Sequence, residues 1–352
     1  MIAQTDRQTD RQTDRQTDRQ TEGLFAFPQG RIEWVDIAKA VAIVLVIIGH
    51  TVKFGSGTRN VIFSFHMPLF FLLSGYTYRL ANEREMFIRR LKKGCRHLIL
   101  PCLIVSVISI IASWWQGNVH DAASFWQITK RMGDALWWAS GVGVHGHPGA
   151  GAIWFLFSLF WAKTLMDGLH LLFPGKYIGS MYVFLGLVGI ALGIKGKWLP
   201  QNMDVTFVAI LFIYLGMLWR KYHEIIEEHA AVLFLIAVSF WISCLCFDQY
   251  IEMAGRHYPY LALSMIEALC GSFAVCYLCR ALAQNVYVKC VTLFVGIHTL
   301  LIFLVHHLDW IAAPLWQTSS YWLTCITRVL IVLAVSFLLH VLRYYWRKMR
   351  TV

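Results

Sequence analysis

Three histidines lie within long apolar stretches of this chain, where a titratable side chain is costly to place. His50 follows the run AVAIVLVIIG, His66 lies in FSFHMPLFF, and His306 ends the run LLIFLVH. An imidazole near neutral pH can accept a proton from a hydroxyl, pass a proton onward or bind a metal. Because ionisable groups inside apolar spans are functional candidates by default, we expect these three side chains to carry the chemistry.

His50 shares a predicted helical face with two charged residues. Asp36 and Lys39 are three residues apart, so they can pair on one face of a helix. Lys39 and His50 are eleven residues apart, which is just over three turns and about 16 Å of rise. The spacing predicts a stripe with a cation at one end and an imidazole at the other. The alternative is a lysine that reaches to the membrane surface and a hydrogen-bonded core histidine.

Basic residues concentrate in the segment LANEREMFIRRLKKGCRH, residues 80–97. One interpretation is an amphipathic anchor on the anionic inner leaflet of a membrane. The other is a cleft for a phosphorylated ligand, since Lys and Arg form charge-assisted hydrogen bonds with phosphate. The cations expected to line such a cleft are Lys39, Arg89, Arg90, Lys93 and Arg96.

No metal site is expected from the sequence. The histidines form no HxxxH pair and have no Asp or Glu directly beside them. Cys276 and Cys279 have the spacing of metal ligands, but they lie within an apolar run without a partner pair, which favours buried thiols.

Apolar helices must position these residues. Of the 352 residues, 58% are apolar and only 14% are charged, which excludes an ordinary soluble domain. Several runs are long enough to cross a bilayer as a helix. We predict an all-α integral membrane protein, a polytopic bundle of about ten transmembrane helices. Its predicted spans are residues 35–52, 60–79, 98–115, 151–167, 178–194, 204–219, 229–247, 259–282, 291–308 and 319–342.

The formal charge of +11 indicates topology rather than binding to nucleic acid. In a helical bundle, every second connecting segment lies on the same side of the membrane. Most Lys and Arg residues outside the N-terminal repeat fall on one such set of segments, which includes residues 79–96 and 343–350. Such segments face the cytoplasm by the positive-inside rule. Both termini are therefore expected in the cytoplasm.

One long loop, residues 116–150, is expected on the outer side. It contains Trp137 and Trp138, followed by His145 and His147. These rings fit an interfacial aromatic belt, which we favour, or a surface on which sugars stack.

The chain begins with a repeat, since residues 4–19 are four copies of Gln-Thr-Asp-Arg. This polar, charge-balanced sequence predicts a disordered tail at residues 1–30, followed by a membrane domain at 31–345 and a basic tail at 346–352. The codons CAG-ACA-GAC-AGA encode the repeat and are CAGA written three times. Because four is not a multiple of three, gain or loss of one unit shifts the reading frame. Our hypothesis is a slippage-prone switch of expression, or phase variation, which is useful for surface structures of bacteria.

The segment from Trp34 to Tyr78 resembles the signature of the acyltransferase family 3 membrane proteins, and within them the fucose 4-O-acetylase-like branch. Asp36 and Lys39 match its Asp-x-x-basic start, and His50 follows the basic residue after ten intervening positions. The helix FSFHMPLFFLLSGY, residues 63–76, matches the next part of the signature.

Further residues carry the same resemblance. Lys93-Gly-Cys-Arg96, followed by Leu100-Pro101, is similar to the basic-x-x-basic motif of the family, and Trp154-Phe155-Leu156 and His306 are also family-like. Lys39 and Lys93 stand where many members carry Arg. Lysine keeps the charge but loses the bidentate fork, so its phosphate contacts are less directional.

The resemblance implies a membrane-bound O-acetyltransferase. Members commonly transfer acetyl from cytoplasmic acetyl-CoA to hydroxyls of glycans. The acceptor implied here is a surface or lipid-linked saccharide, such as lipopolysaccharide or capsule, and the location is the bacterial inner membrane as a multi-pass protein. On this basis the basic cluster would bind the phosphates of acetyl-CoA. His50 would deprotonate the acceptor hydroxyl or accept the acyl group first, with His66 or His306 orienting it or donating to the oxyanion.

The alternative function is a multi-span transporter or flippase for an envelope saccharide precursor, because intramembrane charges and histidines also suit proton-coupled transport. The two halves of the chain show no clear internal repeat. The polar residues concentrate in the first three predicted helices rather than in matched positions of both halves. Both features favour the enzyme.

A third interpretation is a lipid-glycan synthase or polymerase. It would need a larger outer loop or more carboxylates than the sequence has. The carboxylates that could serve it are scattered: Asp121, Asp134, Asp204, Asp248, Glu252 and Asp309.

Overall fold

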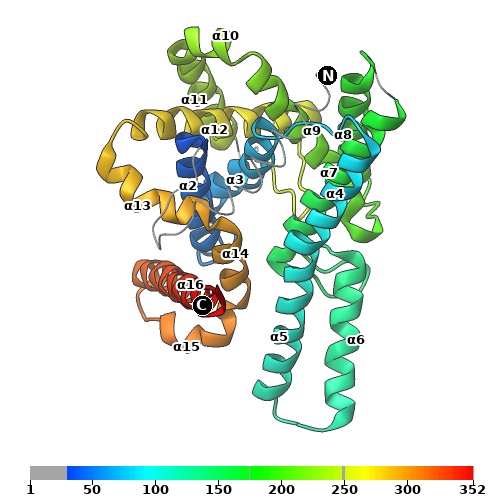
Figure 1. The fold of residues 1–352 in the computed structure, drawn as a ribbon, viewed down its shortest axis with the longest axis vertical. Helices are drawn as coiled ribbons and strands as arrows, with labels where there is room; N and C mark the ends of the chain where they lie inside the picture. Colours follow the sequence, from blue (N-terminus) through cyan, green and yellow to red (C-terminus); the bar gives the residue numbers. More distant parts are fainter. Residues whose placement is uncertain (1–29, 174, 248–249, 352) are drawn as a thin grey trace.

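The computed structural model describes residues 30–173, 175–247 and 250–351, which form helices, turns and two isolated β-bridges without a named strand (Figure 1). The chain is therefore all-helical over this part, as its apolar runs predict. The Gln-Thr-Asp-Arg repeat lies outside the described residues. The helices, in chain order, are α2 (Glu33–Gly49), α3 (Gly57–Tyr76), α4 (Arg84–Gly94), η1 (Cys95–Ile99), α5 (Leu100–Gln116), α6 (Ala122–Trp138), η2 (Gly151–Ile153), α7 (Trp154–Leu172), α8 (Ile178–Ile194), η3 (Pro200–Asn202), α9 (Met203–Lys221), α10 (His223–Glu228), α11 (Ala230–Cys246), α12 (Leu261–Leu282), α13 (Val286–Ile297), α14 (Thr299–Leu308), η4 (Asp309–Ala312), α15 (Ala313–Trp316) and α16 (Tyr321–Thr351).

Within the described residues, six helical segments are long and apolar enough to cross a membrane, which makes this a multi-pass membrane protein. Three shorter apolar helices, α8, α11 and α13, accompany them. The predicted spans fall mainly on helices, but the ninth, residues 291–308, is divided at His298 between α13 and α14. The six long segments are Arg84–Gln116, Gly151–Leu172, Pro200–Lys221, Leu263–Leu282, Thr299–Trp316 and Tyr321–Arg350.

Helices α2 and α3 run antiparallel and carry two of the candidate histidines. Trp34 contacts Tyr76 at one end of the pair, with ring centroids 5.0 Å apart, and His50 contacts Phe63 at the other end, at 5.7 Å. The side chain of Ser56 caps α3 by accepting from the Arg59 backbone N–H. Because the connection between the helices is short, the end of α2 and the start of α3 meet at the same depth.

Two glycines allow α3 to lie directly against α9. A Cβ atom at Gly75 would overlap the backbone oxygen of Ile213, and one at Gly216 would overlap the backbone oxygen of Leu72. The Ser74-Gly75 pair in the sequence is the small-residue pattern that allows this approach. The contact fixes the direction of α3 through the middle of the bundle.

Gly75→Ala is expected to lower the free energy of unfolding by about 1–3 kcal/mol or more, because one backbone must move away from the other. The measurement is the Tm of the detergent-solubilised protein, followed by intrinsic tryptophan fluorescence. The matched control is Gly133→Ala on α6, where nothing lies within 4 Å of the added Cβ atom. Equal melting temperatures for the two variants would contradict the close packing of α3 on α9.

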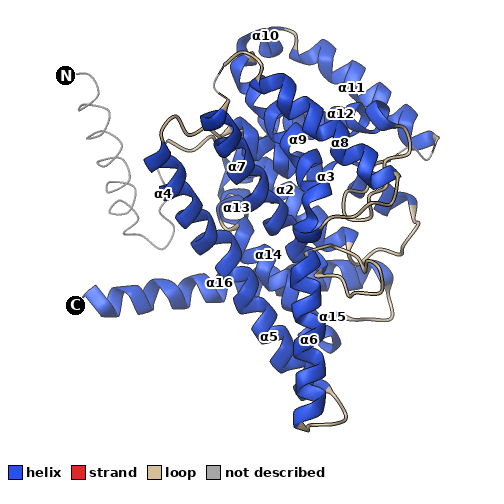
Figure 2. Cartoon of the chain, turned by 90° about the vertical axis from the view of Figure 1, so that its right-hand side faces the viewer, coloured by secondary structure: helices blue, strands red, loops and turns tan. Residues whose placement is uncertain are grey.

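The expected outer loop, residues 116–150, contains a helix of its own. The side chain of Asp121 caps α6 by accepting from the Ser124 backbone N–H at 2.7 Å, and the helix ends where Ala139 adopts a left-handed conformation. Figures 1 and 2 show α5 and α6 side by side, projecting from the rest of the molecule, and Figure 2 shows α16 extending away from the other helices. Helix α16 is continuous to Thr351, through the predicted start of the basic tail at residue 346.

Candidate active site

The structure brings together three candidate histidines: His50 at the end of α2, His66 midway along α3 and His306 near the end of α14. The ring centroids of His50 and His306 are 5.3 Å apart. Phe63 lies between His50 and His66, with its ring 5.7 Å from that of His50 and 4.7 Å from that of His66. His66 and His306 are buried, at 2% and 4% exposed, whereas His50 is exposed. His50 is therefore the imidazole that an incoming molecule meets first.

A small pocket lies beside these histidines. Its free volume of about 20 Å³ has room for little more than one water-sized group. Two of its walls come from segments far away in sequence: residues 152–154, where η2 meets α7, and residues 252–254, in the loop before α12. Side chains that line it include His50, Phe63, His66, Trp154, Glu252 and Phe303. The pocket can hold a hydroxyl or a carbonyl group between two imidazoles, but not a whole sugar ring.

The buried histidine of α3 has a defined tautomer. Nδ1 of His66 lies 2.8 Å from the backbone oxygen of Ile62. A carbonyl oxygen only accepts hydrogen bonds, so Nδ1 carries the proton and donates it. Nε2 of His66 then keeps its lone pair as an acceptor.

His306 is held by a carboxylate that was not expected beside it. Its Nδ1 donates to Asp309 Oδ2 at 2.9 Å. Asp309 also accepts two hydrogen bonds of 2.8 Å from Arg328 Nε and Nη2. The sequence signal for Asp309 was its i,i+3 spacing from His306 at the end of a helix. Arg328 offered only a weak signal, as a single charge near the start of the apolar helix α16.

Arg328 also connects this carboxylate to His50. Its Nη1 donates to the backbone oxygen of His50 and to the Thr51 hydroxyl, both at 3.1 Å, and the guanidinium lies 4.5 Å from the centre of the Trp316 ring. One buried guanidinium thus fixes the end of α2 and the Asp309–His306 pair at the same time. A His–carboxylate pair whose carboxylate is itself held in place is a recurrent arrangement for a general base.

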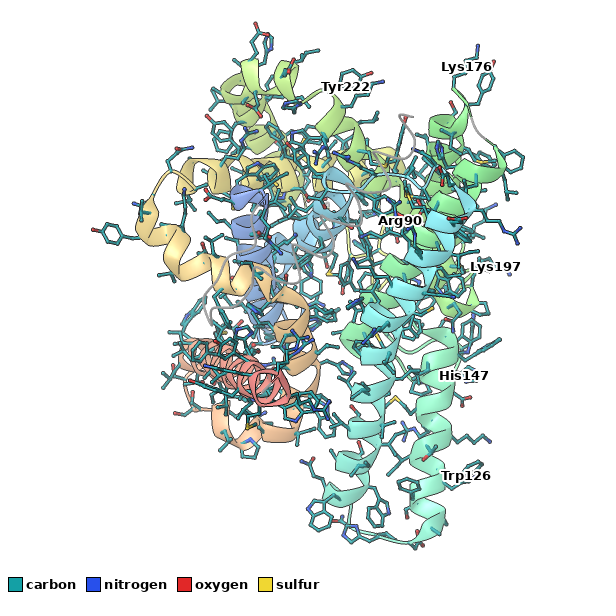
Figure 3. The ribbon with its side chains drawn as sticks, in the orientation of Figure 1. Arg90, Trp126, His147, Lys176, Lys197 and Tyr222 are labelled. Atoms are coloured by element: carbon teal, nitrogen blue, oxygen red, sulfur yellow. The ribbon has the colours of Figure 1, made fainter. Side chains whose placement is uncertain are left out.

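A second, larger pocket lies near the opposite end of α3. Its volume of about 490 Å³ is within the usual range for small-molecule sites. Of the residues expected there, Arg90 and Lys93 line the pocket, whereas Lys39, Arg89 and Arg96 do not. Figure 3 shows Arg90 on α4, well away from Trp126 near the far end of α6. The side chains that line it include Tyr78, Arg79, Arg90, Lys93, Lys163 and Asp167.

Asp167 organises one wall of this second pocket. It accepts from the Tyr78 hydroxyl at 2.6 Å and from the Ala81 backbone N–H at 2.9 Å, and Arg90 Nη1 lies 3.4 Å away. Lys163 lies one turn earlier on α7, with its Nζ 5.0 Å from the centre of the Tyr78 ring. With four basic side chains and one carboxylate, the lining has an excess of positive charge. The sequence does not point to Lys163 and Asp167 as site residues, because α7 reads as an ordinary apolar run.

The predicted Asp36–Lys39 pair lies outside the second pocket. Lys39 Nζ is 3.4 Å from Asp36, but the shorter contacts come from Arg31, whose Nε and Nη2 each lie 2.7 Å from one carboxylate oxygen. The side-chain hydrogen bond with Asp36 raises the pKa of Arg31. Asp36 is buried, and its backbone lies so close to α13 that only Gly296 fits opposite it.

Aromatic side chains occupy the interior between the two pockets. Along α3, Phe71 lies between His66 and the residues of the second pocket. Its ring is 5.0 Å from that of Phe155, which is 5.8 Å from that of Phe303. Phe303 itself lines the histidine pocket. These three rings form one chain of contacts that ends at the histidine pocket.

Groups of three or more His, Cys, Asp or Glu side chains that could hold a metal ion do not occur in the described part of the chain. Cys276 and Cys279 are both buried in α12.

Comparison with protein families gives one match. The sequence model of an acyltransferase domain matches residues 32–344, nearly the whole chain. It spans both pockets and all the residues that line them. Neither a curated protein nor a solved structure matches the chain.

Proposed function

We propose a specific reaction for this chain, which belongs to the acyltransferase family whose model covers it: the transfer of acetyl from acetyl-CoA to a hydroxyl of a surface or lipid-linked saccharide. The observation that carries the proposal is the pair of pockets at the two ends of α3. One is basic and large, and the other is small and lined by imidazoles. An anionic donor and a neutral hydroxyl need these two environments.

The basic pocket is the proposed site for the phosphates of acetyl-CoA. Arg90 and Lys93 come from the amphipathic helix α4, and Lys163 adds a third cation from α7. Each can form a charge-assisted hydrogen bond with a phosphate oxygen. The uncharged pantetheine arm would then run beside Phe71 and Phe155 toward the histidines, displacing part of their packing. The neutral, apolar character of that route suits the arm better than it suits an ion.

His50 is the proposed general base. The pKa of a sugar hydroxyl is high, so its attack on a thioester needs a base within hydrogen-bond reach. His50 takes the hydroxyl proton while the oxygen attacks the acetyl carbonyl. The C–S bond then breaks, and the proton passes to the departing thiolate of CoA. His66, whose Nε2 keeps its lone pair, can orient His50 by accepting a hydrogen bond. His306, held by Asp309, orients His50 or, once it is protonated, stabilises the oxyanion that forms.

The proposed topology has about ten membrane spans and both termini in the cytoplasm. Figure 3 shows Lys176 and Tyr222 near one end of the molecule and Trp126 near the opposite end. The first end carries the basic helix α4 and the basic pocket, which supports placing it on the cytoplasmic side where acetyl-CoA is made. The histidine pocket would then face the outer side of a bacterial inner membrane, where the acceptor is reached.

We also propose that expression is phase-variable through the CAGA repeat, which favours lipopolysaccharide or capsule as the source of the acceptor. Sequencing the gene tests this point directly. A continuous CAGA tract in the DNA that encodes residues 4–19 supports slippage, and mixed synonymous codons would contradict phase variation.

The reaction itself is tested with membranes that contain the protein, acetyl-CoA labelled in the acetyl group, and saccharide extracted from cells that lack the gene. We expect the label to appear in the saccharide as an alkali-labile ester. A transporter or flippase would move saccharide across the membrane without forming this ester, so label-free saccharide in this assay would contradict the proposed function.

Neutralising the basic pocket is expected to weaken donor binding. Lys93→Gln and Lys163→Gln should each raise the KM for acetyl-CoA about tenfold, because a charge-assisted hydrogen bond contributes about 1.5–3 kcal/mol. The matched control is Lys176→Gln, an exposed lysine at the same end of the molecule and outside the pocket lining. A KM for acetyl-CoA that stays at the wild-type value in the Lys93→Gln/Lys163→Gln double variant would place the phosphates elsewhere.

A further inference from the structure

The outer wall of the histidine pocket contains an ion pair that the reaction above does not use. Arg59, in the first turn of α3, and Glu252, in the loop before α12, face each other. Nη1 of Arg59 lies 3.1 Å from Glu252 Oε2, and Nη2 lies 2.9 Å from Oε1. The two side chains are only 10% and 12% exposed. Among the lining residues, Glu252 is the carboxylate.

The guanidinium is also stacked between two aromatic rings. Arg59 Cζ lies 3.7 Å from the centre of the Phe63 ring and 4.5 Å from that of Phe54. Phe63 touches His50 and His66, so the ion pair is one ring away from the imidazoles. Phe54 is 77% exposed and is not among the residues that line the pocket. The order from outside to inside is therefore an open aromatic face, a planar ion pair and the histidines.

The pair keeps unused hydrogen-bonding capacity. In the described part of the chain, the Arg59 guanidinium donates only to Glu252, and the Glu252 carboxylate accepts only from Arg59. A guanidinium has five N–H donors and a carboxylate has about four acceptor positions. Several donors and acceptors thus remain in one plane. Neighbouring hydroxyls of a sugar ring, which both donate and accept, match such an array.

The loop that carries Glu252 does not depend on this pair for its position. Arg256, four residues further on, is buried and donates to Asp204 at 2.8 Å, to Ser140 at 2.7 Å and to Asn202. Its guanidinium also lies 3.9 Å from the centre of the Trp198 ring. This network already fixes the loop against two other segments, around Ser140 and at residues 198–204. The Arg59–Glu252 pair is therefore free to serve a ligand.

We propose that Phe54, Arg59 and Glu252 form the acceptor subsite, which binds an uncharged sugar ring next to the hydroxyl that is acetylated. The neighbouring hydroxyls of the reacting sugar bind the ion pair, and the exposed face of Phe54 packs against the next unit of the saccharide. Only the reacting hydroxyl enters the pocket, whose volume of about 20 Å³ admits no more. Because the two charges cancel, the subsite favours a neutral sugar over an acidic one. This assignment rests on the proposed acetyl transfer.

The test uses detergent-solubilised full-length protein, acetyl-CoA, and unacetylated surface saccharide extracted from cells that lack the gene. The KM for each substrate is measured for the wild type and for Glu252→Gln, Arg59→Gln and Arg59→Lys. We expect the KM for the saccharide to rise at least tenfold in all three, with the KM for acetyl-CoA unchanged within twofold. Arg59→Lys keeps the charge but loses the planar fork. The matched control is Arg131→Gln, an exposed arginine on α6.

An exchanged pair, Arg59→Glu with Glu252→Arg, separates binding from structure. A merely structural ion pair would be rescued by the exchange, whereas a subsite that needs the guanidinium on Phe54 would not. The subsite is overturned if the exchange restores the saccharide KM, if the single variants leave it within twofold, or if they raise the KM for acetyl-CoA instead. Each of these results leaves the proposed function standing. If the wild-type protein transfers no acetyl to the saccharide, the proposed function fails and the subsite fails with it.

Discussion

His50→Ala is expected to lower the rate of acetyl transfer by about 10²–10⁴-fold, the usual contribution of a general base. The residue is exposed at the mouth of the pocket, and its ring lies beside those of Phe63 and His306. The structure holds the His50 backbone through the Arg328 guanidinium, which contacts the carbonyl oxygen and not the ring. Removing the imidazole therefore takes away the base without breaking the contact that fixes the end of α2.

The measurement is the initial rate of ester formation at saturating acetyl-CoA, with size-exclusion elution and the affinity for acetyl-CoA as checks of folding. The matched control is His120→Ala, an exposed histidine whose Nδ1 contacts the Trp114 carbonyl in the loop between α5 and α6. The control should keep the wild-type rate. A folded His50→Ala protein that acetylates as fast as the control would remove His50 from the mechanism.

Asp309→Asn is expected to have the largest combined effect on stability and rate. It leaves the buried Arg328 without its charge partner, which costs about 3–5 kcal/mol when one member of such a pair is removed. It also removes the acceptor that keeps the proton on Nδ1 of His306. The wrong tautomer at a histidine base can lower the rate by up to about 10⁴-fold. We expect a lower Tm and a loss of at least 10²-fold in the rate.

A double variant separates these two effects. Asp309→Leu with Arg328→Met replaces both charges by apolar groups of similar size, and such replacements of a buried pair are often neutral for stability. The Tm should return toward the wild-type value, while the rate stays low because His306 has lost its partner. If the rate recovered together with the Tm, Asp309 would be a structural residue and His306 would need no carboxylate.

The helical framework follows from the sequence because apolar runs of this length have few other structures available in a membrane. The meeting of the three histidines also follows, since alternate helix directions place the ends of α2, α3 and α14 at one depth. The break at His298 and the helix α6 could not be predicted in this way. Both depend on packing between segments rather than on the composition of one run.

The partners of the histidines were harder to predict than the histidines themselves. Arg328 lies nineteen residues after Asp309, and its contact with His50 joins α16 to the end of α2. Lys163 and Asp167 line the basic pocket together with Arg90 only because α7 packs against α4. Such contacts depend on the rotational orientation of each helix about its own axis. The positions of isolated charges in the sequence do not determine that orientation. The positively charged segment at 80–97 indicated the region of the pocket, but not which of its cations face inward.

The most direct test of the account is the transfer of labelled acetyl from acetyl-CoA to the extracted saccharide by wild-type membranes and by membranes with His50→Ala. The wild type is expected to give an alkali-labile label in the saccharide, and the variant at least 10²-fold less, although both proteins bind acetyl-CoA equally. Equal labelling by the two proteins, or no labelling by the wild type, would contradict it.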